Sequence, residues 1–185
     1  MRLKTPRVTP ISETDFDEEQ TQMIAPLKAR TGIVHNVLKT LMRNMELLRA
    51  WNPFAMHLLN ASSLSPRHRE MLIMRVAWLV RSDYEWGQHV QMSRPAGLTD
   101  ADHLRIKDGP KAKGWNELEA ALLQATDELL DDAMIEDATW STLSKHLSTQ
   151  QIMDVVFTVG QYNMLAMALN SMGVQREAGV PGFPE

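Results

Sequence analysis

The sequence of 185 residues contains no cysteine. The chain can therefore form no disulfide bond, and thiol chemistry is excluded. Any reaction that it catalyses must run on proton transfer, polarisation or binding. The absence also agrees with a reducing compartment, because cytoplasmic proteins seldom hold disulfides, and we expect a cytoplasmic protein.

Long hydrophobic runs and an excess of basic charge are also lacking. No stretch approaches the roughly 18 consecutive apolar residues that a membrane span needs. The opening segment MRLKTPRVTPISETD has no continuous apolar segment of the kind found in a secretory signal. The formal net charge is -4, and basic residues do not cluster with aromatic ones. We therefore expect a soluble protein without a nucleic-acid or membrane partner.

Several signatures of cofactor and nucleophile sites are missing as well. The nine glycines are scattered and form no G-x-G-x-x-G or P-loop, and no G-x-S-x-G elbow occurs. A metal site needs three or four ligands, and the five histidines other than His89 stand in no ligand-spaced motif. These are His35, His57, His68, His103 and His146. We expect no metal and no cofactor.

Helix signals are abundant, whereas no segment shows sustained strand-like alternation. Ser65-Pro66 is a strong helix start, and Ser148 with Gln151 fits a capping box. Asp15 is the expected N-cap of the first helix. The pattern predicts an all-α fold with an extended arm over 1–15, one helical domain over 16–175 and a tail over 176–185.

The segment from Met71 to Val80 is apolar almost all round, which predicts a central helix. A tight turn at 81–83 leads into the next helix, so the two helices should form an antiparallel hairpin. If Asp83 caps the second helix, Glu85 and His89 stand four residues apart on one face. An acid and an imidazole at that spacing can act as a proton-transfer pair.

Each member of this pair also has a purely structural explanation. Glu85 in a first helical turn can simply complement the helix dipole, which would favour its ionised form. His89 can be a satisfied core histidine.

Glu70 lies on the same face of the central helix as Ile73 and Met74. Burial there should push the pKa of Glu70 upward unless the carboxylate is paired. The hairpin could bring Glu70 near His89 or Tyr84, and a carboxylate–imidazole contact would fix the tautomer of the ring. The structural alternative is an ion pair with one of the nearby basic residues, Arg67, Arg75 or Arg81.

Several landmarks recur in order along the chain: the run 64–78, the Tyr-Glu-Trp-x-x-His pattern over 84–89, Ala96-Gly97-Leu98-Thr99, Asp154 and the run 159–163. Together they resemble the conserved core of the alkylhydroperoxidase D/carboxymuconolactone decarboxylase family. The resemblance covers about residues 38–175. It implies an all-α fold in which a helical hairpin carries the site, in a homo-oligomer (a trimer, hexamer or dimer).

The resemblance also suggests roles for individual residues. Glu70 matches the proton-relay glutamate of the family, and His89 matches the histidine that ends the redox motif. Ser82 and Glu85 stand where the peroxidase branch has its two cysteines. The decarboxylase branch also lacks the cysteines and has a glutamate four residues before the histidine, so the chain resembles the non-redox branch.

These features together predict an enzyme without a cofactor, acting by proton transfer on a small organic acid or lactone as a decarboxylase or isomerase. We expect His89, Glu85 and Glu70 to be catalytic. The substrate-binding residues should be Ser82, Tyr84, Trp86 and Tyr162. The alternatives are a non-catalytic oligomeric protein that binds a small molecule, and a thiol peroxidase, which the absence of cysteine argues against.

Overall fold

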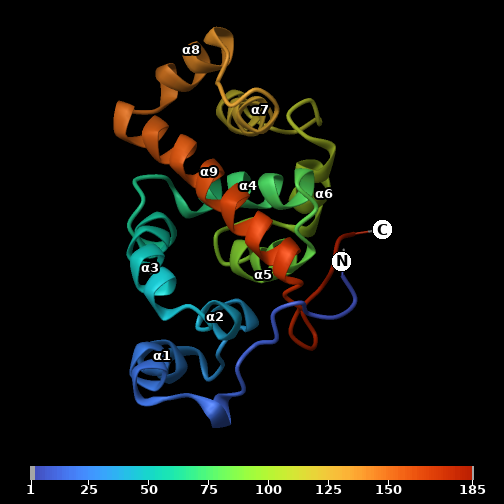
Figure 1. The fold of residues 1–185 in the computed structure, drawn as a ribbon. Coiled ribbons are helices and arrows are strands. Elements are labelled where there is room, and N and C mark those ends of the chain that lie inside the picture. Colours follow the sequence, from blue (N-terminus) through green and yellow to red (C-terminus); the bar gives the residue numbers. More distant parts are fainter. Residues whose placement is uncertain (1–2, 185) are drawn as a thin grey trace.

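A computed structural model of the chain describes residues 3–184 (Figure 1). These residues form helices and no strand, which confirms the all-α prediction. A single 3₁₀ turn, Glu13–Asp15, precedes the helices. The helices are α1 (Glu18–Thr31), α2 (Asn36–Leu41), α3 (Met45–Asn60), α4 (Pro66–Leu79), α5 (Asp83–Ser93), α6 (Asp100–Asp108), α7 (Glu117–Asp131), α8 (Asp137–His146) and α9 (Thr149–Met172).

Two of the four predicted helix caps are confirmed. The Ser65 side chain accepts from the backbone of His68 with Pro66 in the first turn, and Ser148 and Gln151 form the expected capping box. Two caps were wrong by one or two residues. Asp17, not Asp15, caps α1 because its carboxylate bonds the backbone of Gln20.

The second correction concerns the hairpin. Ser82 rather than Asp83 is the N-cap of α5, and its hydroxyl makes no capping hydrogen bond. The turn is tight because Arg81 adopts a left-handed φ of 56°. The Ser82 backbone then donates to the Ala77 carbonyl at 2.8 Å. This shift places Glu85 at the third position of α5 without moving Glu85 and His89 off their common face.

Helix α4 lies in the middle of the molecule, with α5 on one side, α7 on the other and α9 crossing it (Figure 1). One side of α4 packs Leu72, Ile73 and Val76 into a core shared with α7, α8 and α9. The other side packs Met71 and Met74 against α5 and α6. The apolar sequence all round this helix thus reflects burial on every side.

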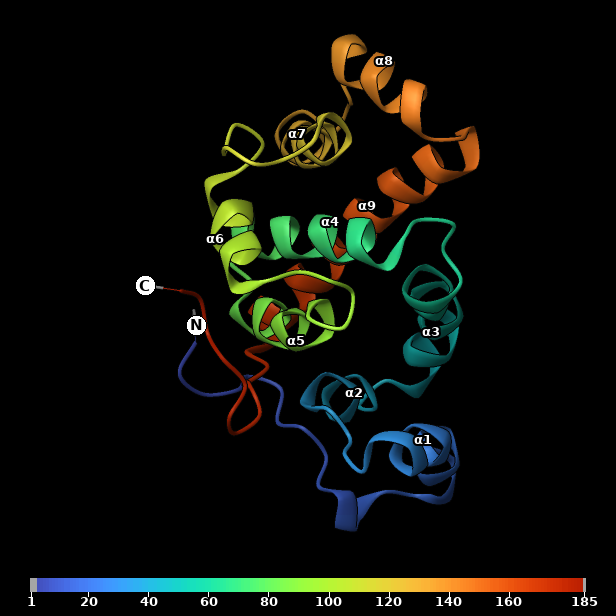
Figure 2. The same ribbon diagram turned by 180° about the vertical axis from the view of Figure 1, so that it is seen from behind.

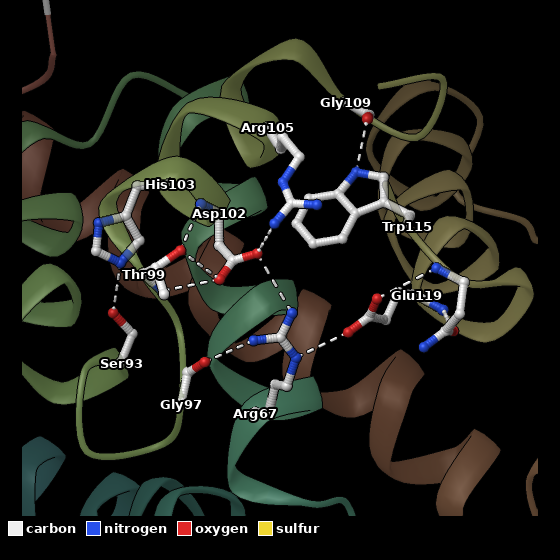
Figure 3. Close-up of polar contacts among 11 residues, drawn as sticks. Arg67, Ser93, Gly97, Thr99, Asp102, His103, Arg105, Gly109, Trp115 and Glu119 are labelled. Carbon is white, nitrogen blue, oxygen red and sulfur yellow. Dashed lines mark hydrogen bonds and ion pairs between the residues drawn. The ribbon is translucent and has the colours of Figure 1, made fainter. Parts of the chain in front are cut away.

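A polar network ties the start of α4 to α6 and α7 (Figure 3). The Arg67 guanidinium donates to Glu119 at 2.7 Å, to the Gly97 carbonyl at 2.7 Å and to Asp102 at 3.4 Å. Arg105 also binds Asp102. These contacts fix the orientation of α4, and therefore of the hairpin that it opens.

The two ends of the described chain lie side by side near α5 (Figure 2). The Arg7 backbone donates to the Met172 carbonyl, and the Gln175 side chain donates to the Leu3 carbonyl. The tail then crosses α5, where the Phe183 backbone donates to Asp83. The tail of the protein is therefore part of the wall around the hairpin.

Helix α9 is the one helix among residues 3–184 that is long and apolar enough, by length and composition, to cross a membrane. Half of its most apolar window is buried within the fold, and a core helix of a soluble protein meets the same criterion.

Candidate active site

The α4–α5 hairpin brings Glu70 and His89 together. Oε2 of Glu70 lies 2.7 Å from Nδ1 of His89, and both side chains are buried. Arg69 donates to the other oxygen of Glu70 at 3.2 Å. The Tyr162 ring from α9 meets the His89 ring edge to face, with ring centroids 5.2 Å apart. The imidazole is therefore held in place from two sides.

The Glu70 carboxylate is paired, which is the case in which burial was not expected to raise its pKa. Burial of this carboxyl opposes ionisation, but His89 and Arg69 together lower its pKa below the ordinary value. Among the basic residues suggested from the sequence, Arg67 and Arg75 are directed to Glu119 and Asp127 instead. The contact with His89 was predicted correctly, whereas the ion pair with Arg69 was missed.

Glu85 also differs from the expectation. It is fully enclosed, and within residues 3–184 neither of its oxygens has a hydrogen-bond partner. Burial raises the pKa of Glu85 well above its ordinary value, although the nearby Ser82 hydroxyl acts in the opposite direction. The first-turn position was expected to favour the ionised form. Burial outweighs the helix dipole here and favours the protonated, neutral form of the carboxyl.

A cavity of about 210 Å³ lies beside the hairpin. Its wall comes from α1, the segment before α2, α2, α3, α5 and α9. The lining residues are Leu27, His35, Val37, Leu38, Trp51, Asn52, Ala55, Met56, Leu59, Tyr84, Glu85, Gln88, His89, Met92, Gln161, Tyr162, Leu165 and Leu169. The cavity therefore joins the predicted residues Glu85, His89, Tyr84 and Tyr162 in one place.

The hydroxyl of Tyr84 is fixed from the tail. It donates to Glu177 at 2.9 Å and accepts from the Val37 backbone at 3.2 Å. Burial and the neighbouring Glu177 carboxylate raise the pKa of Tyr84. The Gln88 side chain donates to the second oxygen of Glu177. The tail thus orders two side chains of the cavity wall.

Two predicted substrate-binding residues lie elsewhere. Trp86 is buried on the opposite side of α5, where it packs against Trp78 and Phe183. Ser82 is fully buried and does not line the cavity. The structure brings neither side chain to the cavity with Glu85 and His89.

Sequence reasoning did not find Gln161, which lines the cavity, or Glu177, which lies behind the wall residues Tyr84 and Gln88. Gln161 accepts a hydrogen bond from the Trp51 indole at 3.1 Å, which links α9 to α3 beside the cavity. Glu177 comes from the tail, far from the hairpin in sequence. Contacts of this kind leave no local pattern of spacing.

A second constellation, Ser93, His103 and Asp100, resembles a nucleophilic triad, but none of the three residues lines the cavity. Figure 3 shows the contact between Ser93 and His103. Nε2 of His103 is 2.9 Å from the Ser93 hydroxyl, and Nδ1 is 3.6 Å from Asp100. Ser93 is completely buried and donates to the Val90 carbonyl, so no substrate can reach it. This arrangement is structural. Within residues 3–184, no three metal-ligating side chains gather into a site.

The fold is similar to that of solved structures. An uncharacterised peroxidase-related protein from Silicibacter sp. TM1040 aligns over 97% of this chain and 93% of its own, with 21% identity and a TM-score of 0.80. The alkylhydroperoxidase D core protein from Ralstonia eutropha JMP134 aligns over 92% of both chains, with 17% identity and a TM-score of 0.81. The debrominase Bmp8, in complex with 2,3,4-tribromopyrrole, aligns over 95% of this chain and 94% of its own, with 15% identity and a TM-score of 0.76.

Part of the sequence also matches a known protein family. No curated relative matches the chain. Residues 45–128, from α3 to most of α7, match the model of the carboxymuconolactone decarboxylase family. This segment contains Glu70, Glu85 and His89, and the full sequence contains no cysteine. This segment of the chain is therefore similar to the carboxymuconolactone decarboxylase family, and it contains no cysteine.

Proposed function

We propose that the protein is a cofactor-independent enzyme that transfers protons on a small organic substrate, as a decarboxylase or isomerase acting on a lactone or organic acid. One observation carries the proposal. The imidazole of His89 lines the cavity while its Nδ1 is held by the buried carboxylate of Glu70. A histidine oriented in this way is a typical general base.

The geometry defines the role of each nitrogen. An ionised Glu70 accepts a hydrogen bond, so Nδ1 carries the proton and the lone pair is on Nε2. Within the described chain no hydrogen bond occupies Nε2. Nε2 would take a proton from a substrate carbon next to a carbonyl group, leaving an enolate-like intermediate. The same proton would return to a different carbon in an isomerisation. In a decarboxylation no carbon proton would be removed: the electron pair of the broken C–C bond would form the enolate-like intermediate as carbon dioxide leaves, and a protonated His89 would then protonate that carbon.

Glu85 supplies the complementary function. A neutral carboxyl can donate a hydrogen bond to a substrate oxygen as negative charge develops there. Because no described residue binds its oxygens, the proton is available for this purpose. A buried neutral acid beside an oriented imidazole gives one acid and one base in the same cavity.

Turnover by variants tests the proposal. We expect Glu85→Gln and His89→Ala to lower kcat by about 10²- to 10⁴-fold, the usual contribution of a general acid or base. The control is His146→Ala, since this histidine is paired with Glu117 at the surface. Thermal unfolding with a panel of lactones and keto, hydroxy and unsaturated acids would identify candidate substrates first. Full turnover by both site variants would refute the assignment.

A non-catalytic binding protein is the second candidate, because a mostly apolar cavity is also what a carrier requires. The neighbour captured with 2,3,4-tribromopyrrole has this fold and holds a small aromatic molecule. A carrier would bind its ligand without converting it. The stabilities of the variants separate the two, since removing a catalytic group is often neutral or stabilising.

A further inference from the structure

The polarity of the cavity wall indicates the kind of ligand that the cavity can hold. The parts contributed by α1, α2 and α3 are largely apolar and include Leu27, Leu38, Ala55 and Leu59. Polar groups are concentrated on α5 and at Gln161 and Tyr162 of α9. A ligand would therefore place one polar edge against the hairpin and an apolar body against α3.

The volume of the cavity limits the size of the apolar part of the ligand. An apolar cavity of about 150 Å³ in another protein holds benzene. The cavity here, at about 210 Å³, therefore accepts one substituted five- or six-membered ring.

Positive charge is absent from the wall. Among the described residues, no lysine or arginine lines the cavity. Arg69 approaches Glu70 and is matched by that carboxylate, and it does not line the cavity. An anionic substrate would therefore find no dedicated cation.

The two histidines of the wall already face carboxylates. His89 is paired with Glu70 at 2.7 Å, and Nδ1 of His35 lies 3.8 Å from Glu177. Any positive charge on either ring would be matched by its own partner. The remaining acid of the wall, Glu85, has a pKa well above its ordinary value because of burial. The carboxylate of Glu177 lies just behind Tyr84 and Gln88.

We infer that the substrate is an uncharged, one-ring molecule with a single carbonyl or hydroxyl edge, such as a neutral lactone or cyclic ketone, and not an organic-acid anion. This inference rests on the proposed function for the site and narrows it to isomerisation of an uncharged substrate, because a decarboxylation requires a carboxylate. Burying a carboxylate without a cationic partner is costly, whereas an uncharged carbonyl needs only hydrogen-bond donors. Glu85 and Tyr162 lie at the cavity to supply such groups.

Isosteric pairs of ligands provide the test. Benzamide with benzoate and 2-furamide with 2-furoate keep the ring and change only the charge. Isothermal titration of the full chain at neutral pH should show each amide binding at least about tenfold more tightly than its carboxylate. Equal or tighter binding of the carboxylates, or no binding of either amide, would overturn the inference.

A variant that adds the missing charge sharpens the test. Asn52 lines the cavity and has no side-chain hydrogen bond within residues 3–184. Asn52→Lys should raise the affinity for benzoate by about tenfold and leave benzamide nearly unchanged. Asn52→Gln is the matched control and should change neither. Failure of Asn52→Lys to improve benzoate binding would contradict the argument from charge.

The test of this inference and the test of the proposed function can fail independently, because the titrations measure binding and involve no turnover. Tighter binding of the amides, in a protein whose turnover does not depend on His89, would contradict the proposed function alone. Tighter binding of the carboxylates, with turnover that does depend on His89, would contradict only this inference.

Discussion

Oε2 of Glu70 lies 2.7 Å from Nδ1 of His89 in the interior of the α4–α5 hairpin, and no surface of Glu70 is exposed. Such a contact forms only if the two helices are joined by a short turn and packed closely. The left-handed Arg81 and the buried Ser82 provide that turn. The position of the imidazole at the cavity is therefore set by the fold itself.

Substitutions of Glu70 should separate stability from catalysis. Glu70→Ala leaves Arg69 and His89 without their buried partner and should cost about 3–5 kcal/mol of unfolding free energy. Glu70→Gln keeps a hydrogen-bonding group and should cost less, but should lower turnover by about 10- to 100-fold through the loss of charge behind His89. Chemical denaturation and steady-state kinetics check both values. Equal turnover in wild type and Glu70→Gln would contradict a positioning role.

The same carboxylate predicts a dependence of stability on pH. Its pKa is lower in the folded protein than the ordinary 4.5. The stabilisation by the ionised form is therefore complete above about pH 4.5 and is lost as the pH falls through the folded pKa. The stability difference between wild type and Glu70→Gln should shrink in acid. Denaturation curves of both proteins over this range give the test, and a constant difference would argue against it.

The contribution of Glu85 to stability should depend on pH in the opposite direction. Because its pKa is raised in the folded protein, the unfolded chain releases this proton first. Its contribution to stability falls as the pH rises from the ordinary 4.5 toward the folded pKa. Glu85→Gln should therefore be more stable than wild type at neutral pH, and the gain should disappear in acid. A destabilised variant at neutral pH would show that Glu85 is ionised and paired.

The close approach of the tail to α5 requires a glycine. A Cβ atom added at Gly87 would lie 2.3 Å from the Pro181 carbonyl oxygen and 2.7 Å from Val180. Gly87→Ala should therefore destabilise the protein by about 1–3 kcal/mol despite the better helix propensity of alanine. Gly160→Ala on α9 is the control, since nothing lies within 4 Å of its Cβ. That change should stabilise by about 0.5–1 kcal/mol, and thermal unfolding of both variants tells the two effects apart.

The sequence allowed the helices and the Glu70–His89 contact to be predicted, because both follow from local signals. Caps such as Ser65 and Ser148 mark helix starts, and a short turn between apolar helices forces them together. The position of Trp86 could also have been inferred. One residue after Glu85, it is rotated by about 100° around α5 and therefore cannot share its face.

Other features depend on burial that no local pattern reveals. Sequence position alone suggested an ionised Glu85, but its protonation is decided by the helices packed around it. The ion pair of Glu70 with Arg69 was missed for the same reason, and it adds to the effect of His89 in lowering the Glu70 pKa. Glu177 approaches Tyr84 across 93 positions of sequence, so only the folded chain shows the contact.

Glu177 is the residue through which the tail acts on the cavity. Its carboxylate accepts from the Asn36 backbone at 2.6 Å, from the Tyr84 hydroxyl at 2.9 Å and from the Gln88 side chain. In Glu177→Gln a donor replaces one of the accepting oxygens. We expect a loss of about 1–3 kcal/mol in stability, since hydrogen bonds to charged groups are the stronger ones. Ligand affinity should also fall, because Tyr84 and Gln88 line the cavity.

Glu117→Gln is the matched control, because this glutamate is exposed and pairs only with surface groups. Its stability should change by no more than about 0.5 kcal/mol. Tyr84→Phe removes a single hydrogen bond to Glu177 and should reproduce part of the loss of affinity. If Glu177→Gln lowers stability as much as expected but leaves ligand titrations unchanged, the tail supports the fold without shaping the cavity. A loss of affinity shared by Glu177→Gln and Tyr84→Phe, and absent from Glu117→Gln, would establish the tail as part of the binding site.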